Sequence, residues 1–357
     1  VDGFREDVIT YISKVEGLPD DHIMPASKGM THYNHGPHVH EYLREFKEEV
    51  LDHYDCFTIA EAPLVAPKKA LEYIDEKNGV MDMMIQFQCV SADCFLSDYY
   101  PMKFSLRRMK KAFSDWQYKL EGKAWNYLYI ENHDHPRIVS RYGSEEYQKE
   151  SAKMLAAMYL FQKGTPFIYQ GQEIGMTNWR PDSIEKYRDV QTIWNYNHTA
   201  LNKTEEERLK RQWRSARDSA RTPVQWSDEK NAGFTTAETP WIDVNENYTQ
   251  INVAQQEADP DSVLNFYRKA IDLRKKLRCV RHGVYQEYFH SSDKFYMYSM
   301  TEESQKILVV CSFCDKEVKF PTPKGFDMDK AQLILCNYAE PKKNTLHPYE
   351  CKVYLWK

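Results

Sequence analysis

Residues 56–61 read CFTIAE, a short strand-like run that ends in a carboxylate at Glu61. Three further runs of this kind follow along the chain, at residues 83–87, 127–130 and 166–171. Segments with helical patterning lie between the runs or precede them, at residues 38–52, 105–120 and 146–163. Because strands that alternate with helices form parallel sheets with crossover helices, the sequence predicts an α/β architecture.

The composition is that of a globular protein. The 357 residues are 42% hydrophobic and 28% charged, which excludes long disordered, collagen-like and coiled-coil chains. The chain exceeds the usual domain length of about 100–200 residues, so one large domain and one smaller domain are expected. No apolar run approaches the roughly 20 residues of a membrane helix. A net charge of −5 argues against nucleic acid as a partner.

The last third of the chain changes its pattern. A helix with a period close to 3.6 is predicted at residues 262–277, and five strand-like segments follow it. We therefore expect a first domain over residues 1–277, interrupted by a polar insertion at about residues 176–240. A separate C-terminal β-sandwich domain is expected over residues 278–357.

Carboxylates recur where predicted strands end. Asp7 ends a further predicted strand at the start of the chain, Glu61 ends the strand at residues 56–61, and Asp134 follows the run at residues 127–130. Active sites of α/β barrels are built at this end of the strands. A carboxylate nucleophile and a protonated carboxylic acid are what glycoside hydrolysis requires. The alternative is that these residues are solvated loop acids or helix N-caps.

Several local sequences resemble those of one enzyme family. They are GFREDVI at residues 3–9, TIAEAP at 58–63, NHDHPR at 132–137, GTPFIYQGQEIGM at 164–176 and ARTPVQW at 220–226. In this order they resemble the conserved regions of glycoside hydrolase family 13, the α-amylase family, and the longer blocks resemble its oligo-1,6-glucosidase group. The resemblance implies a (β/α)8 TIM barrel followed by an antiparallel β domain.

The resemblance assigns catalytic roles to three carboxylates. It implies that Asp7 is the nucleophile, that Glu61 is the general acid/base, and that Asp134 stabilises the transition state. Side chains alternate along a strand, so Arg5 faces the same way as Asp7 and keeps it ionised. The pKa of Glu61 is expected to be raised by burial and by the charge of Asp7. Because the family retains configuration, the two carboxyl groups are expected about 5–5.5 Å apart.

Other residues are expected to bind substrate. His133 resembles a family histidine that bonds sugar hydroxyls, and Arg221 resembles an arginine at the pocket for the non-reducing-end sugar. Arg217 stands in a similar context and remains an alternative to Arg221. A valine directly after the nucleophile accompanies α-1,6 preference in this family, and here it is Val8.

Two positions depart from the family pattern. Glu6 stands where the group usually has an apolar residue and, by strand alternation, points away from Asp7. A carboxylate there requires a cation to pair with it. His135 stands in place of a common glutamine beside Asp134, and it is expected to alter the aglycone side of the site.

No metal site is predicted in this chain. The histidines at 32, 35, 38 and 40 have the residue type of a metal site, but they align with a family segment that holds no catalytic metal. The CxxC at residues 311–314 lies within a predicted strand and has no second CxxC to complete a site. The eight cysteines are expected to be free thiols, as in a cytoplasmic protein.

The resemblance also implies that the chain begins at the fourth barrel strand and is the C-terminal portion of a longer enzyme. The family's calcium site would then lie in the missing N-terminal part, so no cofactor is expected in this chain. Expressed alone, the 357-residue chain is expected to be inactive.

The expected activity is that of a retaining α-glucosidase that hydrolyses terminal α-1,6 bonds of short, isomaltose-type oligosaccharides. Trehalose-6-phosphate hydrolase and α-1,4-glucosidase are alternatives within the family. Sucrose isomerases are disfavoured, because no Arg-Leu-Asp-Arg run precedes Trp125. A non-catalytic partner subunit is an alternative from another class, which the three acids argue against. The expected partners are an oligosaccharide substrate alone, with no nucleic acid and no membrane, and the protein is expected to be a cytoplasmic monomer.

Overall fold

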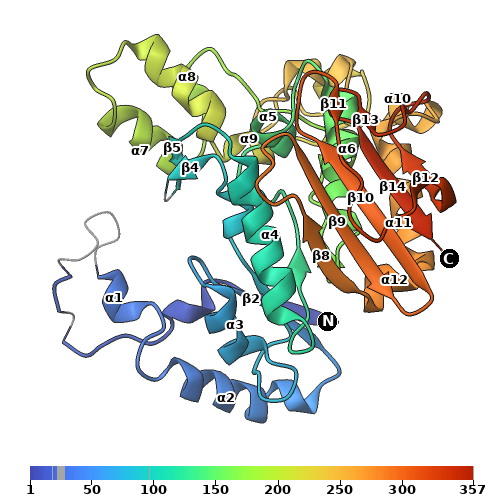
Figure 1. Ribbon diagram of the computed structural model, residues 1–357. Coiled ribbons are helices and arrows are strands. Elements are labelled where there is room, and N and C mark those ends of the chain that lie inside the picture. Colours follow the sequence, from blue (N-terminus) through green and yellow to red (C-terminus); the bar gives the residue numbers. More distant parts are fainter. Residues whose placement is uncertain (18, 22–28, 96, 357) are drawn as a thin grey trace. The chain divides into compact units, whose positions relative to one another are not determined.

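The computed structural model describes residues 1–17, 19–21, 29–95 and 97–356 (Figure 1). The chain divides into two compact units. The first comprises Val1–Gln88 and Phe113–Tyr127, and the second comprises Cys89–Ala112 and Leu128–Lys357. No helix in the described part of the chain is both long enough and apolar enough to cross a lipid bilayer.

The first unit contains a parallel sheet with crossover helices. Its strands are β1 (Gly3–Glu6), β2 (Phe57–Glu61) and β3 (Met83–Ile85), hydrogen-bonded in the order β1-β2-β3. Its helices are α1 (Met30–Tyr33), α2 (Val39–Glu49), α3 (Pro67–Ile74) and the second half of α4 (Leu106–Leu120). Both strand pairs are parallel, as the alternation of strands and helices predicts. The carboxyl ends of β1 and β2 therefore lie at one edge of the sheet.

A single apolar core holds this sheet to its helices. Four of the five residues of β2 are buried, and Ala60 packs in one cluster with Val39 and Leu43 of α2. Tyr73 of α3 and Trp116 of α4 complete the cluster, and both are fully buried. Burial of this apolar surface fixes the strand ends that carry Asp7 and Glu61.

The second unit begins with the hairpin of β4 (Cys94–Phe95) and β5 (Ser97–Pro101). The helices that follow are α5 (Ile138–Tyr142), α6 (Gln148–Leu160), α7 (Val190–His198), α8 (Glu205–Ser215), α9 (Asp218–Arg221), α10 (Val253–Ala258), α11 (Val263–Lys276) and α12 (Arg278–His282). Helix α6 is buried on all sides. The expected insertion at residues 176–240 contains α7, α8 and α9, of which α7 and α8 are drawn in yellow-green in Figure 1.

Three strands are shorter than the sequence predicts, and the first of them, β3, ends at Ile85 instead of residue 87. Instead of residues 127–130 and 166–171, the paired segments are only β6 (Tyr127–Leu128) and β7 (Thr165–Pro166). After β7 the chain turns at Gly171, whose φ is 86°, into a short 3-10 turn. A Cβ at Gly171 would lie 2.3 Å from Met176 Sδ, so this turn requires glycine.

The C-terminal strands form an antiparallel sheet in the order β12-β14-β10-β9-β8. They are β8 (Val284–Tyr288), β9 (Phe295–Glu302), β10 (Gln305–Ser312), β12 (Gln332–Cys336) and β14 (Cys351–Trp356). A two-stranded sheet of β11 (Val318–Lys319) and β13 (Thr345–Leu346) contributes to one apolar cluster with β9 and β10, and α6 contacts β10 and β14. The domain boundary predicted between residues 277 and 278 lies inside the second unit and stays a prediction.

Candidate active site

In the first unit, two of the predicted catalytic carboxylates, Asp7 and Glu61, pair with the same guanidinium group, that of Arg5. Arg5 Nη1 donates a hydrogen bond of 2.8 Å to Asp7 Oδ1, and Arg5 Nη2 lies 2.5 Å from Glu61 Oε2. The Asp7 side chain is 72% exposed, whereas that of Glu61 is 5% exposed. One carboxylate is therefore accessible to a ligand and the other is enclosed, while a single guanidinium holds both.

Strand geometry explains this arrangement. In the parallel register of β1 and β2, Arg5 pairs with Ile59 and Glu6 with Ala60, so Glu61 follows at the same edge as Asp7. Directly after Asp7, Val8 adopts a left-handed conformation with φ 44° and ψ 43°. Few β-branched residues adopt these angles, and strained residues of this kind cluster at active sites. The turn at Val8 ends β1 and leaves Asp7 at the strand terminus.

Glu6 is the exception on this strand. Both carboxyl oxygens are buried, and no ion pair involves Glu6 among the residues that the structure describes. The cation that the sequence calls for at this position is not found there. Burial is the main cause that raises the pKa of Glu6 to about 7. Below about pH 7 the folded protein therefore keeps this carboxyl protonated and neutral, where an ion pair was expected.

The third carboxylate, Asp134, lies in the second unit among three basic side chains. Arg221 Nη2 and Arg217 Nη1 both donate to Asp134 Oδ1, at 3.1 and 3.3 Å. His133 Nε2 lies 3.2 Å from Asp134 Oδ2. The backbone N–H of Asp134 donates to the Asn132 side chain at 2.9 Å, which fixes the turn that carries it. The arginine assigned to substrate binding and its alternative thus contact the same carboxylate.

A buried acid lies behind these arginines. Asp189 is buried before α7, and its Oδ1 accepts from Arg217 Nη2 at 2.6 Å. Its Oδ2 accepts from Tyr99 Oη at 2.8 Å and from Thr192 Oγ1 at 2.7 Å. Burial alone would raise the pKa of Asp189, but the hydrogen bonds from Arg217, Thr192 and Tyr99 lower it to about 2. Asp189 therefore stays ionised near neutral pH.

The loop that carries Asp134 is held by a buried ion pair. Arg137 Nη1 lies 2.6 Å from Glu131 Oε1, and both side chains are buried. Glu131 Oε2 accepts from the backbone N–H of Ile138, and Arg137 Nη1 also donates to the carbonyl of Gln170. These bonds tie the two ends of the loop over residues 131–138 to each other and to the segment after β7.

His135 belongs to a second buried network, on the hairpin of β4 and β5. His135 Nδ1 lies 2.5 Å from Asp98 Oδ2, and Arg141 Nη2 lies 2.8 Å from Asp98 Oδ1. Arg141 also contacts Asp93 at 2.6 Å. The expected effect of His135 on the aglycone side stays a prediction, but the residue links Asp134 to this hairpin.

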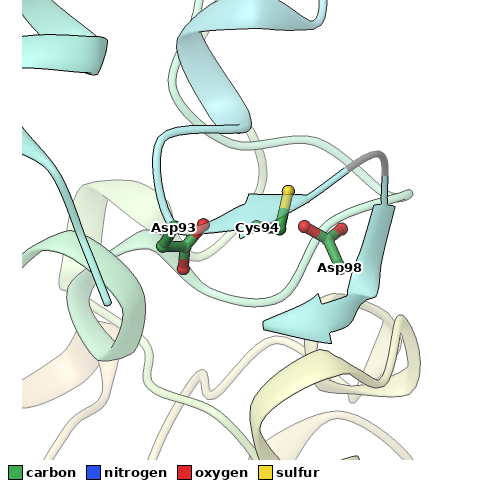
Figure 2. A group of neighbouring side chains, drawn as sticks. All are labelled: Asp93, Cys94 and Asp98. Carbon is green, nitrogen blue, oxygen red and sulfur yellow. The ribbon is translucent and has the colours of Figure 1, made fainter. Parts of the chain in front are cut away.

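Asp93, Cys94 and Asp98 have the residue types of a metal site, and Figure 2 shows them on the hairpin. Their potential ligand atoms lie within 4.8 Å of one another. However, Arg141 bonds to both carboxylates and supplies the positive charge that a cation would bring. Burial raises the pKa of Cys94 to about 11, so a metal ion would have to displace the thiol proton as well as the Arg141 guanidinium. The cluster is an ion-pair network rather than a metal centre.

The histidines at 32, 35, 38 and 40 do not converge on one point. His35 bonds to Tyr73 Oη at 2.5 Å, His38 to Glu41 at 3.0 Å and His40 to Glu72 at 3.2 Å. His32 lies 3.3 Å from the carbonyl of Asp20. Each ring nitrogen has a different polar partner, so the four rings are not arranged as the ligands of one metal ion.

The predicted residues fall into two groups. Arg5, Asp7, Val8 and Glu61 lie together in the first unit. His133, Asp134 and Arg221 lie together in the second. The expected separation of about 5–5.5 Å between the Asp7 and Glu61 carboxyl groups stays a prediction.

Sequence reasoning missed Asp189. The residue directly precedes a helical segment, and an aspartate at that position indicates an N-cap. The N-cap signal indicates where the helix begins, but it does not reveal that the Asp189 carboxylate pairs with Arg217.

Comparison with known proteins agrees with these motifs. Residues 1–283 match the profile of the α-amylase catalytic domain. The chain is 42% identical to an oligo-1,6-glucosidase of Halalkalibacterium halodurans, covering 100% of this chain and 65% of that protein. It is 37% identical to a trehalose-6-phosphate hydrolase of Bacillus subtilis, covering 99% of this chain and 64% of that protein.

A solved structure shows the same fold. The trehalose-6-phosphate hydrolase of Bacillus licheniformis superposes with a TM-score of 0.92 at 38% identity, over 99% of this chain and 65% of that one. The chain thus spans about two thirds of the length of the relatives that it matches. The predicted fold, part of a TIM barrel followed by an antiparallel β domain, is confirmed. From its motifs, its profile match and its structural neighbours, the chain belongs to glycoside hydrolase family 13, the α-amylase family.

Proposed function

We propose that this chain carries the catalytic residues of a retaining α-glucosidase that hydrolyses terminal α-1,6-glucosidic bonds of short oligosaccharides. The observation that carries the proposal is the single guanidinium of Arg5 between the exposed Asp7 and the buried Glu61. An exposed carboxylate suits a nucleophile, and a buried carboxyl suits a proton donor. The 42% identity to an oligo-1,6-glucosidase supports the substrate class.

The charges of Arg5, Asp7 and Glu61 suit this chemistry. With one carboxyl protonated, Arg5 balances the other, and the three side chains are neutral together. In the first step Asp7 forms a bond to the anomeric carbon while the glycosidic oxygen leaves with the proton of Glu61. In the second step Glu61 takes a proton from water, the water oxygen bonds to the anomeric carbon, and Asp7 is released. Asp134 stabilises the positive charge that develops on the sugar.

A second candidate is trehalose-6-phosphate hydrolysis. The 0.92 TM-score to the Bacillus licheniformis hydrolase favours it. Its substrate differs from isomaltose by a phosphate group and by the linkage. Hydrolysis of α-1,4 bonds is supported by a 39% identical α-glucosidase of Pediococcus pentosaceus. Within the proposal the protein acts as a cytoplasmic monomer and needs no cofactor bound to this chain.

A substrate panel tests the proposal. The protein expressed from its complete coding sequence is assayed on isomaltose, maltose and trehalose 6-phosphate, with product configuration followed by NMR. We expect the highest kcat/KM on isomaltose and initial release of α-glucose. A preference for trehalose 6-phosphate or for maltose identifies the corresponding alternative, and no turnover on any glucoside favours a non-catalytic partner subunit.

The variant Asp7→Asn tests the role of the proposed nucleophile. This variant keeps the shape of the side chain and removes the nucleophilic charge, so turnover is expected to fall by about 10⁴-fold or more. Circular dichroism checks that the fold is retained. A folded variant with near-normal kcat would show that the nucleophile is a different residue.

A further inference from the structure

The two carboxylate oxygens of Asp189 have different hydrogen-bond partners. Oδ2 accepts from the Thr192 backbone N–H at 3.0 Å, which caps α7, and from the hydroxyl groups of Thr192 and Tyr99. Oδ1 accepts from Arg217 Nη2 at 2.6 Å, and Arg221 Nη1 lies 3.9 Å from it. A helix cap needs one acceptor oxygen, so the contact between Oδ1 and Arg217 is more than capping requires.

Arg217 connects this buried acid to Asp134. Its Nη2 bonds to Asp189, and its Nη1 bonds to Asp134 Oδ1 at 3.3 Å. The Asp189 side chain is 2% exposed and that of Asp134 is 25% exposed. The guanidinium plane is rigid, so fixing one of its nitrogens on a buried, immobile carboxylate also fixes the other nitrogen against Asp134.

We propose that Asp189 is a positioning residue, which acts through Arg217 to hold Asp134 in its working orientation. The inference rests on the proposed function, in which Asp134 stabilises the charge on the sugar. Two carboxylates, Asp134 and Asp189, face the two guanidinium groups of Arg217 and Arg221, and the His133 ring also contacts Asp134. Removing the charge of Asp189 leaves two cations on Asp134 alone. Asp134 is then drawn toward them and is a weaker partner for a developing positive charge.

The backbone around Asp189 is also fixed. Asp218 Oδ2 accepts from the backbone N–H groups of Arg188 and Asp189, at 3.1 and 3.0 Å. Asp218 directly follows Arg217 in the chain, so the segment that bears the arginine also holds the segment that bears its acidic partner. The two segments of the 176–240 insertion thus form one rigid support behind Asp134.

The test is Asp189→Asn in the protein expressed from its complete coding sequence. Asparagine is a good N-cap, so α7 keeps its cap while the charge facing Arg217 is lost. We expect kcat on the best glucoside to fall by about 10- to 100-fold, with KM changed by about threefold at most, because the loss affects transition-state stabilisation. The thermal midpoint serves as the measure of fold.

Two further variants separate positioning from structure. In an Arg217→Ala background, Asp189→Asn is expected to cause no further loss of kcat, because Asp189 acts through Arg217. The matched control is Thr204→Ala, which removes the cap of α8 in the same insertion and is expected to lower the thermal midpoint while leaving kcat unchanged.

Several outcomes would overturn the inference. They are a wild-type kcat for Asp189→Asn, or an equal loss of kcat in the wild-type and Arg217→Ala backgrounds. If the wild-type protein turns over no glucoside, the proposed function fails instead. In that case a crystal structure of Asp189→Asn decides the positioning claim, which is rejected if Arg217 still bonds to Asp134 as before and supported if that bond is lost.

Discussion

Glu6, next to the proposed nucleophile, keeps a carboxyl group inside the protein without a cation. Its pKa is raised to about 7, chiefly by burial and slightly by the nearby charge of Asp82, while backbone hydrogen bonds oppose the shift. In the unfolded chain the same group titrates near 4.5. Between these two values the folded state holds a proton that the unfolded state has lost. Stability therefore falls as the pH rises from about 4.5 to 7 and stays reduced above that.

Glu6→Gln is expected to remove this dependence. At pH 8 the variant should be more stable than the wild type by on the order of 1–2 kcal/mol after allowance for solvent screening, and at pH 4 the difference should vanish. Thermal midpoints measured at pH 4, 6 and 8 check this. A constant difference across the three values would show that Glu6 does not titrate in this range.

Val8 is the residue at which a substitution tests the preference for the α-1,6 linkage. Its left-handed backbone directs the chain away after Asp7, and the family resemblance links valine here to α-1,6 preference. We expect Val8→Ala to raise the ratio of maltose to isomaltose kcat/KM by about 10-fold or more, since a methyl-scale contact is worth roughly 1–3 kcal/mol. An unchanged ratio, with both substrates turned over, would show that linkage preference is set elsewhere.

At the scale of elements, the loop between β6 and α5 depends on the Glu131–Arg137 pair. Arg137 also donates to the carbonyls of Gln170 and Ser219, so one buried side chain joins three segments of the second unit. Removing one member of a buried pair leaves an uncompensated charge. The loop that carries Asp134 is therefore sensitive to this position, although Arg137 itself does not contact Asp134 in the structure.

Arg137→Met is expected to destabilise the protein by about 3–5 kcal/mol and to reduce kcat, because Glu131 loses its counter-ion. The control is Lys210→Met, which removes the exposed pair of Lys210 with Glu206 on α8 and should cost less than about 1 kcal/mol. Urea unfolding of both variants measures the difference. Equal destabilisation of the two variants would contradict the role assigned to the buried pair.

At the scale of the whole molecule, the sheet of the first unit has an open edge. Among the described strands β1 pairs only with β2, and Phe4 on β1 is 49% exposed. An edge strand with exposed backbone groups and apolar side chains is a site for association with other chains. A closed barrel has no such edge.

The 357-residue chain expressed by itself is therefore expected to associate into oligomers or aggregates and to show no turnover of p-nitrophenyl α-glucoside. Size-exclusion chromatography, circular dichroism and the assay on this substrate test the expectation together. A monomer with a sharp melting transition and glucosidase activity would contradict it.

The elements themselves follow closely from local patterns in the sequence. The helix predicted at residues 262–277 is α11 (Val263–Lys276), and the strand predicted at 56–61 is β2 (Phe57–Glu61). In α11 the spacing of apolar residues matches the helical period, and β2 is a short run with four consecutive buried residues, as expected for a strand covered on both faces. The pattern failed at residues 166–171, where apolar residues continue but strand pairing ends at Pro166, because strand pairing depends on a hydrogen-bonding neighbour that the hydrophobicity of one segment does not encode.

The sequence by itself determined the family and the α/β alternation and indicated three candidate acids, because these depend on residues close together in the chain. Only the tertiary structure decided which charges share partners. Arg5 pairs with Glu61 as well as with Asp7. Glu6 has no cation among the described residues. Asp189 bonds to Arg217, which lies 28 residues further along the chain. Arg217 in turn contacts Asp134, at a separation of 83 residues. The physical reason is that an ion pair depends on distance and burial, and packing brings together side chains whose separation in the sequence carries no periodic signal.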